Sequence, residues 1–171
     1  MRTLTGLLFG VQLVAAAKVG AQADACGLLS PAAIHAVTGE EVTNTKPSST
    51  DIGNVRHAQC FYSLRTFSNS VSVTLTTPTD GGHRAARELW QRWFHRDAGD
   101  KPESEEEEAA AKATPVAGVG EEAFWVHSFV GNLYVRKGSQ FLRISLGGKM
   151  TDAERQTKAK SLAADAIKHM R

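Results

Sequence analysis

Histidine is the residue type in this chain that most readily does chemistry near neutral pH, because its imidazole can transfer a proton or bind a metal ion. Six histidines are present: His35, His57, His83, His95, His127 and His169. No two of them have the H-x-H or H-E-x-x-H spacing that directs two imidazoles at one metal ion. A metal or hydrolase site would therefore have to be assembled from distant segments, and His57 and His127, with a carboxylate, could meet if their strands were neighbours. The alternative for each histidine is an ordinary surface or core position.

Motifs for nucleophiles and for phosphate binding are incomplete. Ser145 lies within an expected strand and not on the sharp turn of a Gly-x-Ser-x-Gly motif. Gly118 and Gly120 do not follow a strand and open a helix, and Met150 stands where a P-loop needs serine or threonine. These glycines indicate turns. The sequence identifies no catalytic residues, no metal ligands and no cofactor, and it leans against an enzyme.

One expected helix, over residues 83–97, carries the candidate ligand-binding residues. Trp90 and Trp93 fall on one face of it and could stack on a sugar or a peptide. Arg87 on the same helix could bind an anionic ligand. Aromatic residues at helical spacing are more often part of a core, and arginines beside an acidic segment can pair with that segment instead. Both interpretations stay open at this point.

The chain has two cysteines, Cys26 and Cys60, and a leader-like segment precedes the first. Residues 1–23 contain a basic start, an apolar stretch and a small-x-small ending, which is typical of a cleaved secretory signal. We expect cleavage before Asp24, export to the periplasm or out of the cell, and a disulfide between the two cysteines in that oxidising compartment. Lipid attachment at Cys26 is disfavoured, because Asp24 intrudes where small uncharged residues are needed and Cys60 would stay unpaired.

Composition indicates one ordinary globular domain over residues 24–171. The full chain has 20 basic and 18 acidic residues, and the two basic residues of the leader account for the excess, so the expected mature chain is neutral. A neutral chain gives no reason to expect binding to nucleic acid or to an anionic membrane. No stretch after the leader approaches the roughly 20 apolar residues that span a bilayer. The oligomeric state cannot be predicted.

The hydrophobic patterns predict helices and strands in the order α-ββ-α(α)-βββ-α. Helices are expected from Ser30 to Gly39, over 83–97, over 105–113, and from a capping box at Thr151–Glu154 onward. Strands are expected over 58–65, 70–76, 124–129, 133–136 and 141–146. Residues 43–56 should form an exposed loop, and residues 102–115 an exposed acidic helical insertion. The result is an α+β single-domain sandwich, with roughly a five-stranded antiparallel sheet packed against about four helices.

Three landmarks carry a resemblance to a known family. They are the segment Cys26–Ile34 with Gly39, the second cysteine Cys60 in a strand, and the segment Val116–Phe124. Together they resemble a family of small exported bacterial proteins and lipoproteins of unassigned function. The resemblance implies a two-cysteine link and a sheet-plus-helix fold similar to photosystem assembly and nuclear-import factors. It transfers no catalytic residues, and this chain departs from the pattern in having a leader that looks cleaved.

The leading hypothesis for function is therefore an exported, non-enzymatic domain that binds a partner protein or a small ligand in the cell envelope or outside the cell. The alternative is a hydrolase whose site is assembled from distant residues such as His57 and His127. A purely structural envelope protein is a third possibility that the sequence does not separate from the first.

Overall fold

The protein is described here by a computed structural model that covers residues 24–79, 82, 84–97 and 99–170 of the 171-residue chain. The predicted leader, residues 1–23, lies outside the described residues. The helices are α1 (Pro31–Thr38), α2 (Ala85–Phe94), α3 (Glu105–Ala110) and α4 (Asp152–His169), with 3-10 turns η1 (Ala25–Gly27) and η2 (Phe67–Asn69). The strands are β1 (Val42–Ile52), β2 (Val55–Leu64), β3 (Val71–Pro78), β4 (Thr114–Pro115), β5 (Glu122–Val126), β6 (Asn132–Lys137) and β7 (Gln140–Leu146).

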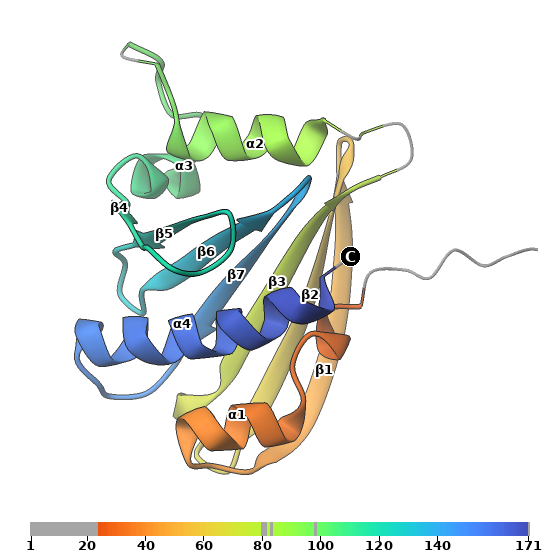
Figure 1. Cartoon of the computed structure of the whole chain (residues 1–171), viewed down its shortest axis with the longest axis vertical. Coiled ribbons are helices and arrows are strands. Elements are labelled where there is room, and N and C mark those ends of the chain that lie inside the picture. Colours follow the sequence, from red (N-terminus) through yellow and green to blue (C-terminus); the bar gives the residue numbers. More distant parts are fainter. Residues whose placement is uncertain (1–23, 80–81, 83, 98, 171) are drawn as a thin grey trace, which may run out of the picture.

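The strands form one antiparallel sheet in the order β1-β2-β3-β7-β6-β5-β4. Two meanders, β1–β3 and β5–β7, are joined at the middle of the sheet where β3 pairs with β7. Figure 1 shows α4 crossing the strands, with α1 below it and with α2 and α3 at the opposite end of the sheet. The predicted α+β single domain with an antiparallel sheet and four helices is confirmed, although the sheet has seven strands and not five.

The two additional strands are β1 and the short β4. The prediction of an exposed loop over residues 43–56 is wrong, because this segment forms most of β1 and the start of β2. β1 is an edge strand whose residues are nearly all exposed, so it has none of the apolar alternation that identifies a strand in a sequence. Pro47 and Lys46 in its middle are residues that natural edge strands tolerate or use to block further pairing.

The capping residues predicted for α1 and α4 form the expected capping contacts in the structure. The Ser30 side chain accepts a hydrogen bond from the backbone N–H of Ala33, and Gly39 ends α1 with a left-handed φ of 77°. Thr151 and Glu154 form the predicted capping box at the start of α4. A helix also forms within residues 102–115, but Glu107 and Ala110 of α3 are buried, so this segment is not exposed throughout.

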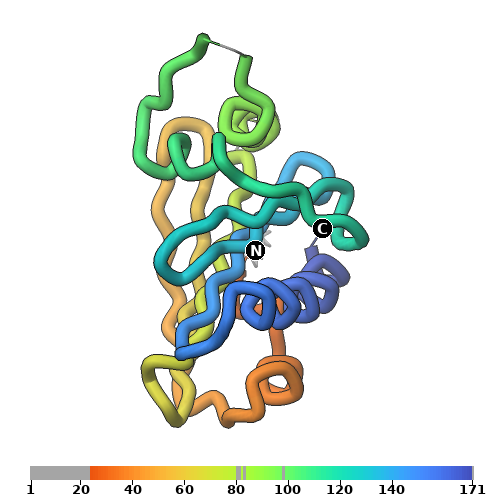
Figure 2. Tube along the Cα trace, turned by 90° about the vertical axis from the view of Figure 1, so that its left-hand side faces the viewer, coloured from red at the N-terminus to blue at the C-terminus, as the bar shows by residue number. Residues whose placement is uncertain are grey.

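Each face of the sheet has its own apolar cluster. The face covered by α1 and α4, here called the α4 face, packs the larger cluster, which includes Ile34, Val73, Ile144 and Leu162. The other face, here called the α2 face, packs a mainly aromatic cluster against α2, consisting of Val55, Ala86, Trp90, Trp93, Ala110, Phe124, Val126, Tyr134 and Phe141. In Figure 2, α1 and α4 lie together to one side of the strands β1 to β3. The α2 face is less completely covered, and the candidate site lies there.

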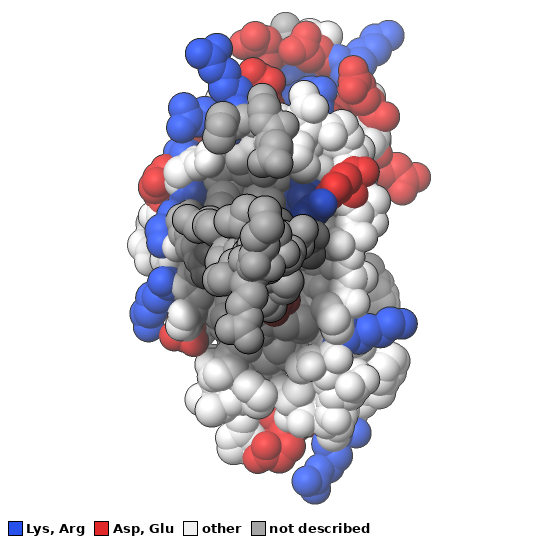
Figure 3. Space-filling model, turned by 90° about the vertical axis from the view of Figure 1, so that its right-hand side faces the viewer, with Lys and Arg blue, Asp and Glu red and all other residues white. Residues whose placement is uncertain are grey.

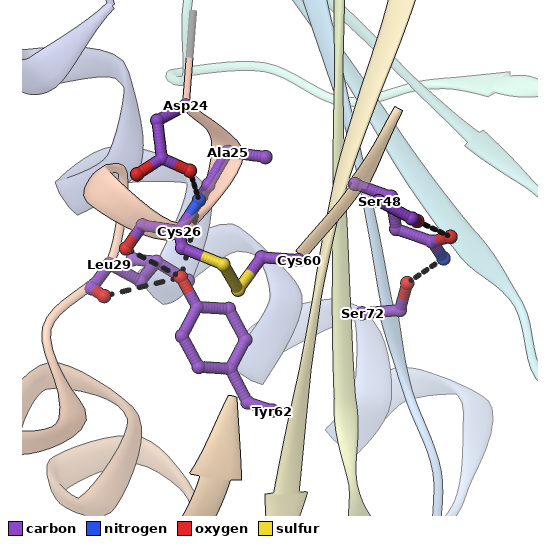
Figure 4. Close-up of a disulfide and its surroundings, with 9 residues drawn as sticks. Asp24, Ala25, Cys26, Leu29, Ser48, Cys60, Tyr62 and Ser72 are labelled. Atoms are coloured by element: carbon purple, nitrogen blue, oxygen red, sulfur yellow. Dashed lines mark hydrogen bonds between the residues drawn. A yellow bond between two sulfur atoms is a disulfide. The ribbon is translucent and has the colours of Figure 1, made fainter. Parts of the chain in front are cut away.

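The expected disulfide joins Cys26, in η1, to Cys60, in the middle of β2, with Cα atoms 4.9 Å apart. Beside it the Tyr62 hydroxyl lies within hydrogen-bonding distance of the carbonyl oxygens of Cys26, at 3.1 Å, and Leu29, at 3.3 Å (Figure 4). These contacts fix the segment before α1 to the α4 face. Within the part of the chain that the structure describes, no helix is both long and apolar enough to cross a membrane.

Candidate binding groove

A groove of about 900 Å³ lies between the α2 face of the sheet and the helices α2 and α3. Its floor comes from β1, β2, β3, β7 and β6, and its walls come from α2, from α3 and the residues before it, and from the β1–β2 turn. Helix α2 contacts the sheet at β3 and β7, and the groove extends from there over β1 and β2.

The floor of the groove is a line of polar side chains, here called the polar row: Ser48, Gln59, Thr74, Arg143 and Tyr134. The row is set by strand register, since these residues lie directly opposite one another on β1, β2, β3, β7 and β6. Gln59 accepts a hydrogen bond from Ser48 at 3.4 Å and donates one to Ser72 at 2.7 Å. Figure 4 shows Ser48 and Ser72 on the side of β2 opposite the disulfide, as the alternation of side chains along a strand requires.

Arg143 is the cationic member of the row. Its guanidinium donates a 2.9 Å hydrogen bond to the Glu106 carboxylate on α3, and Tyr134 lies opposite it in the strand pairing. Burial acts to lower the pKa of Arg143, but Tyr134 and Glu106 outweigh it and the pKa is raised, so the guanidinium stays charged. Burial also raises the pKa of Tyr134, which keeps its phenol neutral.

Thr74 lies between Gln59 and Arg143 in the polar row and lines the groove. Its hydroxyl oxygen is buried and has no hydrogen-bond partner among the described residues. A buried hydroxyl without a partner costs about 1 to 3 kcal/mol, so an acceptor that enters the groove would recover that cost.

His57 lies in the adjacent row, where its Nδ1 is 3.0 Å from the Thr76 hydroxyl. Burial lowers the pKa of His57, so the imidazole is neutral near neutral pH. In the tautomer in which Thr76 donates to Nδ1, the ring proton is on Nε2, which is then a hydrogen-bond donor. The charge of Glu106 acts to raise the pKa of His57 and the charge of Arg143 acts to lower it, but burial has the largest effect.

The sequence hypothesis that His57 and His127 meet is not supported by the strand order. His57 is on β2 and His127 follows β5, and β3, β7 and β6 lie between those two strands. His127 instead pairs with Asp152 at 3.3 Å, on the exposed start of α4. Within the described residues, no group of three or more His, Cys, Asp and Glu side chains is arranged to hold a metal ion.

The wall formed by α2 and α3 is held by a buried carboxylate. Glu107 of α3 accepts hydrogen bonds from Arg96 at 2.9 Å and from the backbone N–H of Glu103 at 2.8 Å, and pairs with Arg92 at 3.2 Å. These contacts attach α3 to α2, and they involve none of the residues of the polar row. The acidic run and the α2 arginines therefore do pair with each other, as the second interpretation of the sequence holds.

The three ligand-binding candidates named from the sequence lie in different surroundings. Trp90 is fully buried in the aromatic cluster, and its indole N–H donates to Glu122 at 2.6 Å. Trp93 is 8 % exposed and contributes to the groove wall, in edge contact with Tyr134 and Phe141. Arg87 lies on the exposed side of α2 and does not line the groove. Of these three residues, only Trp93 borders the groove.

Sequence reasoning missed Arg143, Thr74 and Gln59. Each occupies a polar position in an alternating strand, which by itself only indicates the second face of a sheet. Comparison of the chain with protein-family models, with curated proteins and with solved structures found no match to any of the three.

Proposed function

We propose that the protein is an exported, non-enzymatic domain that binds a small polar ligand in the groove on the α2 face. The observation that carries this proposal is the polar row, with its unpartnered Thr74 hydroxyl, on the floor of a groove of about 900 Å³. Ligand sites are commonly concave, of about 300 to 1,000 Å³, and contain a few placed polar groups. The aromatic side chains beneath α2 supply a rigid wall beside those groups.

A binding role fits the geometry better than hydrolysis. The pair closest to a nucleophile and its base is Thr76 and His57, and Thr76 is only 2 % exposed. A threonine nucleophile needs an adjacent base to activate it, and burial lowers the pKa of His57, which makes its imidazole a weaker base. The side chains that are accessible in the groove are suited to holding a ligand by hydrogen bonds.

Export is supported by the disulfide, since structural disulfides form and persist in oxidising compartments. The leader-like residues 1–23 support the same proposal from the sequence. On the part of the face in Figure 3 that is not drawn in grey, Lys and Arg side chains are interspersed with Asp and Glu, so this face offers no large basic patch to a polyanion.

The test is a nuclear magnetic resonance titration of isotope-labelled protein with a panel of sugars, amides, carboxylates and inorganic phosphate. We expect at least one class to shift the backbone signals of Gln59, Thr74 and Arg143 in a saturable manner. The double variant Gln59→Leu/Thr74→Val should lose these shifts, while Thr157→Val, on the exposed side of α4, should keep them.

The proposal would be overturned if the saturable shifts of backbone signals were confined to residues of the α4 face. It would also be overturned if no compound of the panel caused a saturable shift. Each bound compound is recovered after prolonged incubation and its mass is determined. Unchanged mass is expected, and a hydrolysis product that the double variant does not form would support the hydrolase alternative.

A further inference from the structure

We infer that the groove binds a carboxylate group at Arg143, in the position that the Glu106 carboxylate occupies in the structure. This inference rests on the proposed function and gives the chemical class of the ligand. A carboxylate is already bound at this position, since Glu106 Oε1 accepts a hydrogen bond from Arg143 at 2.9 Å. The ligand would replace an internal carboxylate with an external one.

The groups around Arg143 are hydrogen-bond donors, which is what a carboxylate requires. The planar guanidinium has five N–H groups and matches a carboxylate in geometry. The Thr74 hydroxyl lies directly opposite Arg143 in the strand pairing, is buried, and has no partner among the described residues. Neutral His57 can donate from Nε2 while Thr76 holds its Nδ1. Gln59 is already engaged with Ser48 and Ser72 and is not needed as a donor.

Glu106 can leave Arg143 at little cost. Its side chain is 56 % exposed, and exposed ion pairs contribute little to stability. The attachment of α3 to α2 goes through Glu107, whose side chain is 4 % exposed and which binds Arg92 and Arg96. The Ser104 cap of α3 also bonds to the backbone of Glu107. Exchange of the carboxylate at Arg143 therefore leaves α3 in place.

The charges around the groove favour one carboxylate over a phosphate. Arg92 and Arg96 are engaged by Glu107, and Glu88 and Glu103 add negative charge to the lining. A doubly charged phosphate would be repelled by these acids, and Arg143 would be the main positive charge that attracts it. A single carboxylate that displaces Glu106 keeps the local charge balance that the structure already has.

The test compares matched pairs of compounds: the N-acetyl derivatives of glycine, alanine and phenylalanine, and the corresponding N-acetyl amides. Dissociation constants are measured by isotope-edited titration for the wild-type protein and for Glu106→Gln, Glu105→Gln and Arg143→Gln. We expect the carboxylates to bind more tightly than their amides. Glu106→Gln should tighten carboxylate binding about two- to five-fold by removing the competing internal group, and it should leave the amides unchanged.

Glu105→Gln is the matched control, because it makes the same charge change one position earlier on an exposed residue of α3. It should leave carboxylate binding within about two-fold of wild type, whereas Arg143→Gln should weaken it at least about ten-fold. Inorganic phosphate should bind less tightly than the carboxylates. Glu106→Gln is expected to fold normally, so the test does not depend on the stability of Arg143→Gln.

The outcomes separate this inference from the function on which it rests. If sugars or amides bind in the groove and carboxylates bind no better, the proposed function stands and the inference is wrong. Weaker carboxylate binding in Glu106→Gln would also overturn it, because Glu106 would then be helping to hold the ligand. If no compound in either set binds, both proposals fail.

Discussion

Glu107 of α3 and Arg96, two residues beyond the end of α2, form a 2.9 Å ion pair whose side chains are only 4 % and 10 % exposed. The adjacent acid Glu106 forms its own 2.9 Å pair with Arg143, at 56 % and 30 % exposure. Two neighbouring carboxylates therefore have different roles. The buried one fixes the helix and the exposed one is exchangeable.

Glu107→Ala should destabilise the protein by about 3 kcal/mol, because it leaves the largely buried guanidinium of Arg96 without its carboxylate. Equilibrium unfolding in urea measures the change. Glu108→Ala is the control, since Glu108 is exposed and, among the described residues, pairs with Lys112 on the same segment, and its effect should be under about 0.5 kcal/mol. Equal effects of the two variants would show that Glu107 does not hold α3.

Removal of the disulfide should cost roughly 3 to 4 kcal/mol on the chain-entropy model, because Cys26 and Cys60 close a loop with a sequence separation of 34. The Cys26→Ala/Cys60→Ala variant is compared with wild type by urea unfolding, with and without a reductant. Reductant should weaken only the wild type. Non-reducing peptide mapping should recover the two cysteines in one linked peptide, and two alkylatable thiols in native protein would contradict the structure.

Trp93→Ala should destabilise by about 3 to 5 kcal/mol, because the ring is mostly buried against Tyr134 and Phe141. Arg87→Ala, on the exposed side of the same helix, should change stability by no more than about 0.5 kcal/mol. Thermal and urea unfolding measure both variants. A negligible loss for Trp93→Ala would favour a role in stacking on a ligand over a role in the core.

The pKa of Tyr62 is raised by burial to about 12, from an ordinary value of 10.0. The folded state therefore favours the neutral phenol, and the stability that depends on it is fully present below about pH 10 and is lost as the pH rises towards 12. The variant Tyr134→Phe leaves Tyr62 as the single tyrosine of the chain. Its tyrosinate absorbance should appear near pH 12 in native protein and near pH 10 in urea. Coincident titrations in the two states would refute the predicted shift.

Most of the helices and the inner strands could be predicted from the sequence, because burial on one side leaves a periodic pattern. β3 and β7 alternate apolar and polar residues, and α1 and α4 carry caps that stop and start a helix. β1 could not be found in this way. An exposed edge strand needs no apolar residues, so its composition is that of a loop, and only its pairing with β2 makes it a strand.

The groove could not be predicted for a related reason. Thr74 and Arg143 are about 70 positions apart in the chain and meet only through the register of β3 with β7. That register follows from the fold of the whole chain and from no local motif. Trp93, by contrast, can be placed on the apolar face of its helix from the sequence, because helical spacing is a local property.

The pairing of β3 with β7 has a consequence for how the chain folds. The first meander, β1 to β3, can form from local hairpins, but one edge of β3 stays unpaired until β7 arrives from about 70 residues further along the chain. Long-range pairing of this kind is slow to form and leaves an edge open to aggregation in the meantime. A chain that stops before Gln140 would keep that edge permanently, so assembly of the native sheet waits for the last strand to emerge.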